Sequence, residues 1–154
     1  MNEYGVLPVV PERPIYVIDA SVVLKWFTQL DEGDIDKANL LREKFRNREV
    51  ELLAPELLIY EVTNVLRYKL DLDISDINSA IESIFEMRLL KSMSQGTMKK
   101  VVKIARDADV TVYDATYLSF AESIHSLLIT VDERFYEKVH HRPDVILLKD
   151  FAEP

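Results

Sequence analysis

The residues Ile15-Tyr16-Val17-Ile18-Asp19-Ala20-Ser21 join a short apolar, β-branched run to an aspartate and two small residues. A run of this kind, bounded by polar residues, is typical of a buried β-strand. A second such run, Leu127-Leu128-Ile129-Thr130-Val131, is also followed by an aspartate, Asp132. The two runs predict two strands, each with a carboxylate at its C-terminal end.

The chain between and around these strands is expected to be mostly helical. Apolar residues and turn signals predict helices over residues 22–27, 35–48, 75–87, 97–108, 113–123 and 134–139, with a turn at 31–34. Pro55 suits the first turn of a helix, which is expected to run to about Leu70. Further strands are predicted at 50–53, 88–90 and 145–148. Strands that alternate with helices favour an α/β sandwich with a mainly parallel sheet.

Length and composition are those of one globular domain. The 154 residues are 48% hydrophobic and 30% charged, and they show no internal repeat. Residues 1–14, which contain three prolines, are expected to form an extended arm, and residues 15–154 the folded domain. With no cysteine in the chain, disulfides, cysteine-ligated metal sites and thiol nucleophiles are excluded. Neither common glycine-rich phosphate-binding motif is present.

The formal net charge of −8 argues against tight nonspecific binding to nucleic acid, because such binding depends on neutralising phosphates. The charge is compatible with an enzyme whose carboxylates hold metal ions, and it suggests a basic partner. The sequence shows neither a signal peptide nor a segment long and apolar enough to cross a membrane. We therefore expect a cytoplasmic protein.

Four carboxylates stand out by their positions. The carboxyl ends of neighbouring parallel strands meet at one edge of a sheet, so Asp19 and Asp132 are expected to lie close together there. Glu61 falls beside the apolar stripe of its helix, where a charge without a partner is costly. Asp114 starts a helix whose inward face carries apolar residues.

Carboxylates that share one site repel each other unless a cation compensates them. Mg²⁺ and Mn²⁺ prefer oxygen ligands, and Mg²⁺ is often held by a few carboxylates, waters and substrate phosphate. Such a site can activate water for attack on phosphorus and stabilise the leaving oxygen. The four residues therefore predict a divalent-metal site that acts on a phosphate ester.

The sequence resembles the PIN-domain ribonucleases in four ordered segments. These are Tyr16–Leu24, Pro55–Leu66, Tyr113–Ala121 and Leu128–Phe135. The order and spacing of the segments match the family, and the length is nearest to the VapC-type toxins of toxin–antitoxin pairs. The resemblance implies a three-layer α/β/α sandwich and a Mg²⁺- or Mn²⁺-dependent endoribonuclease.

The resemblance also implies roles for individual residues. Asp19, Glu61, Asp114 and Asp132 would form the acidic catalytic and metal-binding site. Asp19 and Asp114 are expected to bind metal directly, and Glu61 and Asp132 directly or through water. The positions expected to support this site are Ser21, Asn64 and Thr130. Arg134 is expected to contact substrate phosphate. The implied partners are RNA, a second copy of the chain, and an antitoxin that places a basic residue in the site.

Other interpretations of the same residues remain open. An aspartate after a strand is more often a helix cap than a metal ligand, and the hydroxyl of Ser21 suits a cap better than a nucleophile. A catalytically silent PIN-like module that binds a protein is the main alternative function. An aspartyl phosphotransferase of the haloacid dehalogenase type would need a second aspartate at position 21, where this chain has serine. A phosphoacceptor receiver domain would need an acidic pair near the first strand.

Overall fold

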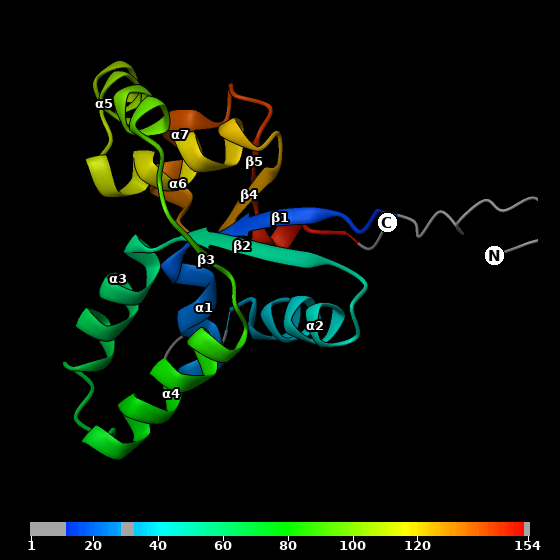
Figure 1. Cartoon of the computed structure of the whole chain (residues 1–154), viewed down its shortest axis with the longest axis vertical. Coiled ribbons are helices and arrows are strands. Elements are labelled where there is room, and N and C mark those ends of the chain that lie inside the picture. Colours follow the sequence, from blue (N-terminus) through cyan, green and yellow to red (C-terminus); the bar gives the residue numbers. More distant parts are fainter. Residues whose placement is uncertain (1–11, 29–32, 153–154) are drawn as a thin grey trace, which may run out of the picture.

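The structure is a computed structural model, and it describes residues 12–28 and 33–152 (Figure 1). Most of the arm predicted for residues 1–14 lies outside these residues, as does half of the turn predicted at 31–34.

The strands of the described chain form one parallel sheet of five, in the order β3-β2-β1-β4-β5. Their bounds are β1 Ile15–Ile18, β2 Glu51–Pro55, β3 Leu90–Lys91, β4 Leu127–Thr130 and β5 Val145–Leu147. The first strand of the chain is the central one: Val17 pairs with Leu53 of β2, and Ile18 pairs with Ile129 of β4. The predicted parallel sheet is confirmed, and the C-terminal ends of β1 and β4 are neighbours.

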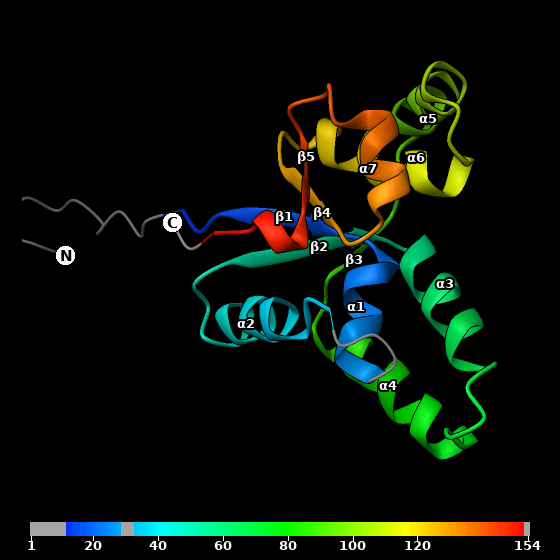
Figure 2. The same cartoon turned by 180° about the vertical axis from the view of Figure 1, so that it is seen from behind.

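Helices cover both faces of the sheet, as Figures 1 and 2 show. One layer contains α1 (Ala20–Phe27), α2 (Ile35–Arg46), α3 (Leu57–Leu66) and α4 (Ile74–Glu86). The opposite layer contains α5 (Gln95–Ala108), α6 (Val112–Ser123) and α7 (Glu133–Val139), and a 3₁₀ turn, Leu148–Asp150, follows β5. The three-layer α/β/α architecture is therefore confirmed. Within the two described ranges, no helix combines the length and the apolar character that a membrane span requires.

Side-chain caps fix where most of these helices begin. In five helices the side-chain oxygen of the residue before the helix accepts a backbone N–H of the first turn. These capping residues are Asp19, Asp73, Ser94, Thr111 and Asp132. Each cap satisfies a donor that has no partner inside the helix. The caps at Asp19 and Asp132 also fix where each strand gives way to a helix, and both lie at the same edge of the sheet.

Several helices end at residues other than glycine whose backbone adopts the left-handed conformation. The chain contains only three glycines. Positive φ angles occur instead at Arg48, Arg88, Asp109 and His125, each at or just after the end of a helix. A side chain in this region costs about 1 kcal/mol or more relative to glycine.

The core lies on both sides of the central strand β1 and its neighbour β4. Val17, Ile18, Leu128 and Ile129 are fully buried in the sheet. Residues 115–121 of α6 are all buried as well, because this helix packs directly on β1, β2 and β4. Burial of each large aliphatic side chain contributes about 1.5–3 kcal/mol. The most buried part of the fold therefore holds the strands and the helix that carry Asp19, Asp132 and Asp114.

Two predictions about the segment after β2 are wrong. Pro55 ends β2 instead of beginning a helix, and it pairs with Lys91 of β3. Ala54 donates its N–H to Leu89, just before β3, and Glu56 donates to Lys91 of β3, while Glu51 donates to Pro14 on the β1 side. The nitrogen of Pro55 therefore faces the side of the sheet on which β1 lies. Because β1 has already ended at Ile18, no N–H donor is required at this position.

The helix expected to reach Leu70 ends at Leu66. Tyr68 and Lys69 donate their N–H groups to the carbonyls of Val65 and Leu66, three residues back. Bonds of this spacing tighten the chain and close the helix one turn early.

Candidate active site

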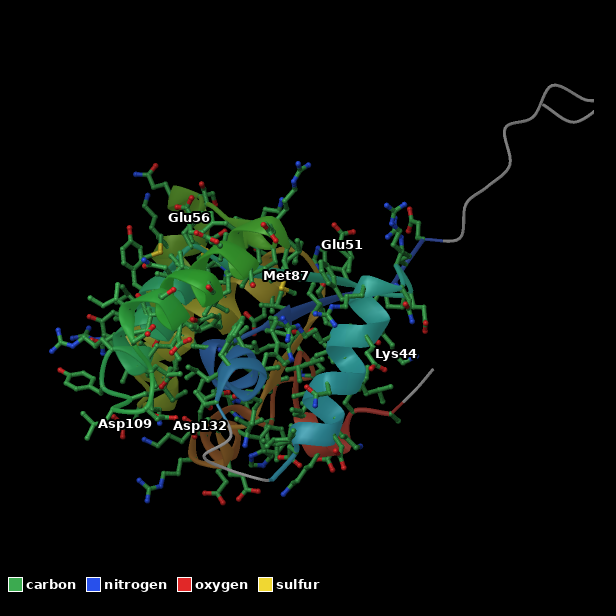
Figure 3. All side chains as sticks on the ribbon, turned by 90° about the horizontal axis from the view of Figure 1, so that it is seen from below. Lys44, Glu51, Glu56, Met87, Asp109 and Asp132 are labelled. Atoms are coloured by element: carbon green, nitrogen blue, oxygen red, sulfur yellow. The ribbon has the colours of Figure 1, made fainter. Side chains whose placement is uncertain are left out.

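The carboxyl ends of β1 and β4 bring two of the predicted carboxylates to one edge of the sheet. Asp19 follows β1 directly and accepts the N–H of Val22 at 3.3 Å as the cap of α1. Asp132 follows β4 and accepts the N–H of Phe135 at 3.0 Å as the cap of α7. Figure 3 shows Asp132 well away from Glu51, which begins β2. The caps expected as the simpler interpretation are present, and they orient both carboxylates.

Two predicted supporting residues link the strand ends. Ser21 donates its hydroxyl to Oδ1 of Asp19 and accepts the N–H of Val131 at 3.1 Å. The fully buried Thr130 accepts the N–H of Asp132 at 3.1 Å, and its hydroxyl lies 3.5 Å from that of Ser21. The two hydroxyls therefore join the β1 end to the β4 end and hold the segments on which Asp19 and Asp132 lie.

The other two carboxylates come from helices in opposite layers. Glu61 lies in the second turn of α3 and Asp114 in the first turn of α6. Asp114 is not the cap of α6, since Thr111 accepts the Asp114 N–H at 3.0 Å. Both side chains are partly buried, as their positions beside apolar residues predict.

All four predicted carboxylates line one pocket of about 250 Å³. The predicted supporting residues Ser21 and Asn64 line it as well; the complete lining is Asp19, Ala20, Ser21, Leu24, Glu61, Asn64, Val65, Asp114, Tyr117 and Asp132. Thr130 lies behind this surface, and Arg134 lines an adjoining hollow. The structure thus brings together residues that are as far apart in sequence as 19 and 132.

Another pocket, of about 310 Å³, is larger but differently lined. Its lining contains Ile59, Tyr60 and Phe85, and Glu56 is its single carboxylate. It therefore lacks the grouped oxygen donors of the carboxylate pocket.

Burial and mutual repulsion make three carboxylates of the pocket, those of Asp19, Glu61 and Asp114, hard to ionise. Burial is the largest cause that raises the pKa of Asp19 from 3.8 to about 6, although hydrogen bonds from Ser21 and Thr130 oppose it. Burial likewise raises the pKa of Glu61, with a contribution from the charge of Asp114. The pKa of Asp114 is raised by burial and by the charge of Asp132.

These carboxylates have no cationic partner in the described chain. The ion pairs between described residues join other acids to lysines and an arginine. Acids whose charge is disfavoured and uncompensated are typical of functional sites. The donor set consists of carboxylate and hydroxyl oxygens, which suits a hard divalent cation.

The acids surround the pocket without meeting at a point. In residues 12–28 and 33–152, no three acidic or histidine side chains come close enough together to form a ready-made metal site. Like charges without a cation between them favour separation. The residue types nevertheless fit Mg²⁺ or Mn²⁺.

Tyr117 is a pocket residue that the sequence did not single out for function. Its hydroxyl donates to Oε1 of Glu61 at 2.5 Å, and the side chain is only 2% exposed. Burial and the nearby charge of Glu61 raise the pKa of Tyr117 far above its ordinary value, so the phenol remains a donor. Its position three residues after Asp114, on the same helical face, is a signal that could have identified it.

Comparisons with known proteins agree with this fold. A search of curated proteins finds no match. Among solved structures, a protein from Pyrobaculum aerophilum is 22% identical, with a TM-score of 0.65, and the match covers 88% of this chain and 85% of that one.

Two complexes also contain similar chains. The toxin–antitoxin complex from Klebsiella pneumoniae gives a TM-score of 0.61 at 15% identity, covering 86% of this chain and 97% of that one. The VapBC2 complex from Rickettsia felis, bound to a promoter DNA fragment, gives a TM-score of 0.61 at 15% identity, and the match covers 86% of this chain and 96% of that one. At these identities the likeness shows the fold.

The sequence itself identifies the family. The family model of the PIN domain matches residues 16–140, which is most of the chain. The matched range includes β1 from Tyr16 onward, β4, and all four carboxylates of the pocket. This chain therefore belongs to the PIN domain family.

Proposed function

We propose that this protein is an endoribonuclease that uses Mg²⁺ or Mn²⁺ to hydrolyse RNA phosphodiester bonds in the carboxylate pocket. The observation that carries the proposal is the pocket itself. It gathers Asp19, Glu61, Asp114 and Asp132 from four separate elements, with no cationic partner in the described chain. Nothing in the protein's own stability requires such an arrangement, whereas a bound cation would compensate it.

The residues around the pocket have distinct roles in this proposal. Asp19 and Asp114 bind the cation directly, and Glu61 and Asp132 bind it directly or through water. The cation would supply a water of lowered pKa and would stabilise the leaving oxygen. The hydroxyl of Ser21 fixes Asp19, and that of Tyr117 fixes Glu61. Asn64, one turn along α3 from Glu61, offers an amide to the same pocket.

We further propose that the protein is the VapC-type toxin of a toxin–antitoxin pair, acting in the cytoplasm as a homodimer. Two structurally similar chains come from complexes described as toxin–antitoxin or VapBC. The net charge of −8 and the acidic pocket suit an antitoxin that inserts a basic residue. Such a residue would occupy the place of the cation and block hydrolysis.

The test is cleavage of a mixed pool of structured and single-stranded RNAs in Mg²⁺, Mn²⁺ or EDTA. Cleavage is expected with either metal and not with EDTA. Asp19→Asn and Asp114→Asn should each lower the rate about 100-fold or more, since loss of residues that merely orient metal ligands already costs about 10–100-fold. The matched control is Asp71→Asn, an exposed aspartate between α3 and α4, which should cut like the unaltered protein.

Circular dichroism of each variant separates loss of chemistry from loss of fold. Full activity in both pocket variants would refute the site. If the unaltered protein neither cuts RNA nor binds Mn²⁺ in titration calorimetry, the catalytically silent protein-binding module becomes the better explanation.

A further inference from the structure

A second hollow adjoins the carboxylate pocket and carries cations. We propose that it binds the phosphate next to the scissile one, so that the protein engages an RNA strand through at least two consecutive phosphates. This inference rests on the proposed ribonuclease function. The hollow has a volume of about 210 Å³, and its charged lining includes Arg134 and Lys138 of α7.

The two hollows share a wall. Asp114 and Asp132 line both of them, so the second hollow begins where the carboxylate pocket ends. Its far side is formed by Asp109, Val110 and Thr111, the turn between α5 and α6. Figure 3 shows Asp109 and Asp132 on the same side of the molecule. A strand with one phosphate at the shared carboxylates can therefore place a neighbouring phosphate beside α7.

The two cations of this hollow differ in how they are engaged. Lys138 donates to the backbone carbonyl of Asp109 at 2.6 Å and to its carboxylate at 3.3 Å, so its charge is already partly compensated. Arg134 is exposed and forms no hydrogen bond or ion pair with any other described residue. Asp132 lies only two residues away, but positions two apart on a helix do not face each other.

Arg134 has the chemistry that phosphate recognition needs. The guanidinium group is always charged, and its planar set of donors can bind two phosphate oxygens at once. In a protein of net charge −8, a cation that no described residue neutralises, beside the acidic pocket, would also offset the repulsion between the carboxylates and RNA. We therefore assign the neighbouring phosphate to Arg134, with Lys138 holding the α5–α6 turn that forms the opposite wall.

The variant Arg134→Gln tests the assignment, because glutamine keeps a polar side chain and removes the charge. The matched control is Arg106→Gln, which removes an exposed arginine of α5 that lines neither hollow. Two substrates are compared: an RNA oligonucleotide that the unaltered protein cuts, and bis-p-nitrophenyl phosphate, which has one phosphate only. A contact with a neighbouring phosphate affects the first substrate alone.

We expect Arg134→Gln to lower kcat/KM about 10-fold or more on the oligonucleotide, as loss of a charge-assisted hydrogen bond does. Its rate on bis-p-nitrophenyl phosphate should stay within about 2-fold of the unaltered protein. Binding of labelled RNA in the Asp19→Asn background gives a readout without catalysis. There the slope of log affinity against log salt should weaken by about 0.7, the value for one phosphate contact in a single strand. The Arg106→Gln variant should change none of these quantities.

Equal losses on both substrates would overturn the proposal, because Arg134 would then contact the scissile phosphate itself. Unchanged kinetics and an unchanged salt slope would overturn it as well. Failure of the proposed ribonuclease function is seen separately, because the unaltered protein would then cleave no RNA. That result would overturn the proposed phosphate subsite as well.

Discussion

Replacing Asp19 by asparagine is expected to stabilise the metal-free protein at neutral pH, although it removes the first residue of the candidate site. The pKa of Asp19 is raised from 3.8 to about 6, chiefly by burial. Ionising this carboxyl is therefore harder in the folded protein than in the unfolded chain. Asparagine carries no charge to bury, and its side-chain oxygen can still cap α1 at the N–H of Val22.

The pKa gives the size of the effect. Each pKa unit corresponds to 1.36 kcal/mol, so the gain at about pH 7 is at most about 3 kcal/mol. Partial contact of Asp19 with solvent makes the expected gain smaller, about 1–3 kcal/mol. Because the folded-state pKa is the higher one, the folded protein binds the proton more tightly. The penalty in the unaltered protein is therefore present above about pH 6, and it disappears as the pH falls toward 3.8.

Urea denaturation in EDTA measures this difference directly. Asp19→Asn should be more stable than the unaltered protein at about pH 7 and equal to it at about pH 4. Saturating Mn²⁺ should reverse the order at neutral pH, since only the intact carboxylate site gains the full free energy of cation binding. The control Asp71→Asn should not change stability in any condition. If Asp19→Asn is no more stable than the unaltered protein at about pH 7 in EDTA, the argument that the buried charge of Asp19 lowers the free energy of unfolding is refuted.

Three further substitutions test other contacts. Tyr117→Phe removes the donor to Glu61 and should weaken Mn²⁺ binding in titration calorimetry and lower stability by about 1–2 kcal/mol; unchanged affinity would show that the hydroxyl does not position Glu61. Ser21→Ala breaks the link from Asp19 to the N–H of Val131 and should lower the unfolding free energy in urea by about 1–3 kcal/mol, and an unchanged midpoint would contradict that. Arg48→Gly relieves the strain of a φ of 61° and should raise the free energy of unfolding by up to about 1 kcal/mol, seen as a higher Tm in thermal unfolding. A lower Tm would show that the greater conformational entropy that glycine gives the unfolded chain outweighs the relief of strain.

The sheet and the two strand-end aspartates were predictable because their signals are local. Ile15–Ile18 and Leu127–Thr130 are short, apolar and β-branched, and each leads into an aspartate that caps a helix. Periodicity alone indicated that Glu61 and Asp114 would lie beside apolar neighbours. That all four line one pocket depends on strand order, which composition and periodicity do not contain. The resemblance to the family supplied the grouping of the four acids, without the strand order.

What the sequence did not show depends on contacts between distant segments. Pro55 has the same local signal at the end of a strand as at the start of a helix, and its place was decided by pairing with Lys91, 36 residues later. Tyr117 has the pattern of a core aromatic residue, and its hydroxyl acquires a role only because α3 places Glu61 against α6. Propensity and periodicity carry no information about either partner.

The central position of β1 makes assembly of the site a late event in folding. The strand translated first must pair with β4, which is more than a hundred residues away, as the register of Ile18 with Ile129 shows. Closing so long a loop is slow relative to forming the local helices. While β4 has not yet emerged from the ribosome, the nascent chain also lacks Asp132 and the N–H of Val131 that fixes Ser21. Synthesis therefore passes through an interval, between residues 114 and 132, in which three of the four acids exist without their common pocket, and a chain broken before residue 127 never completes it.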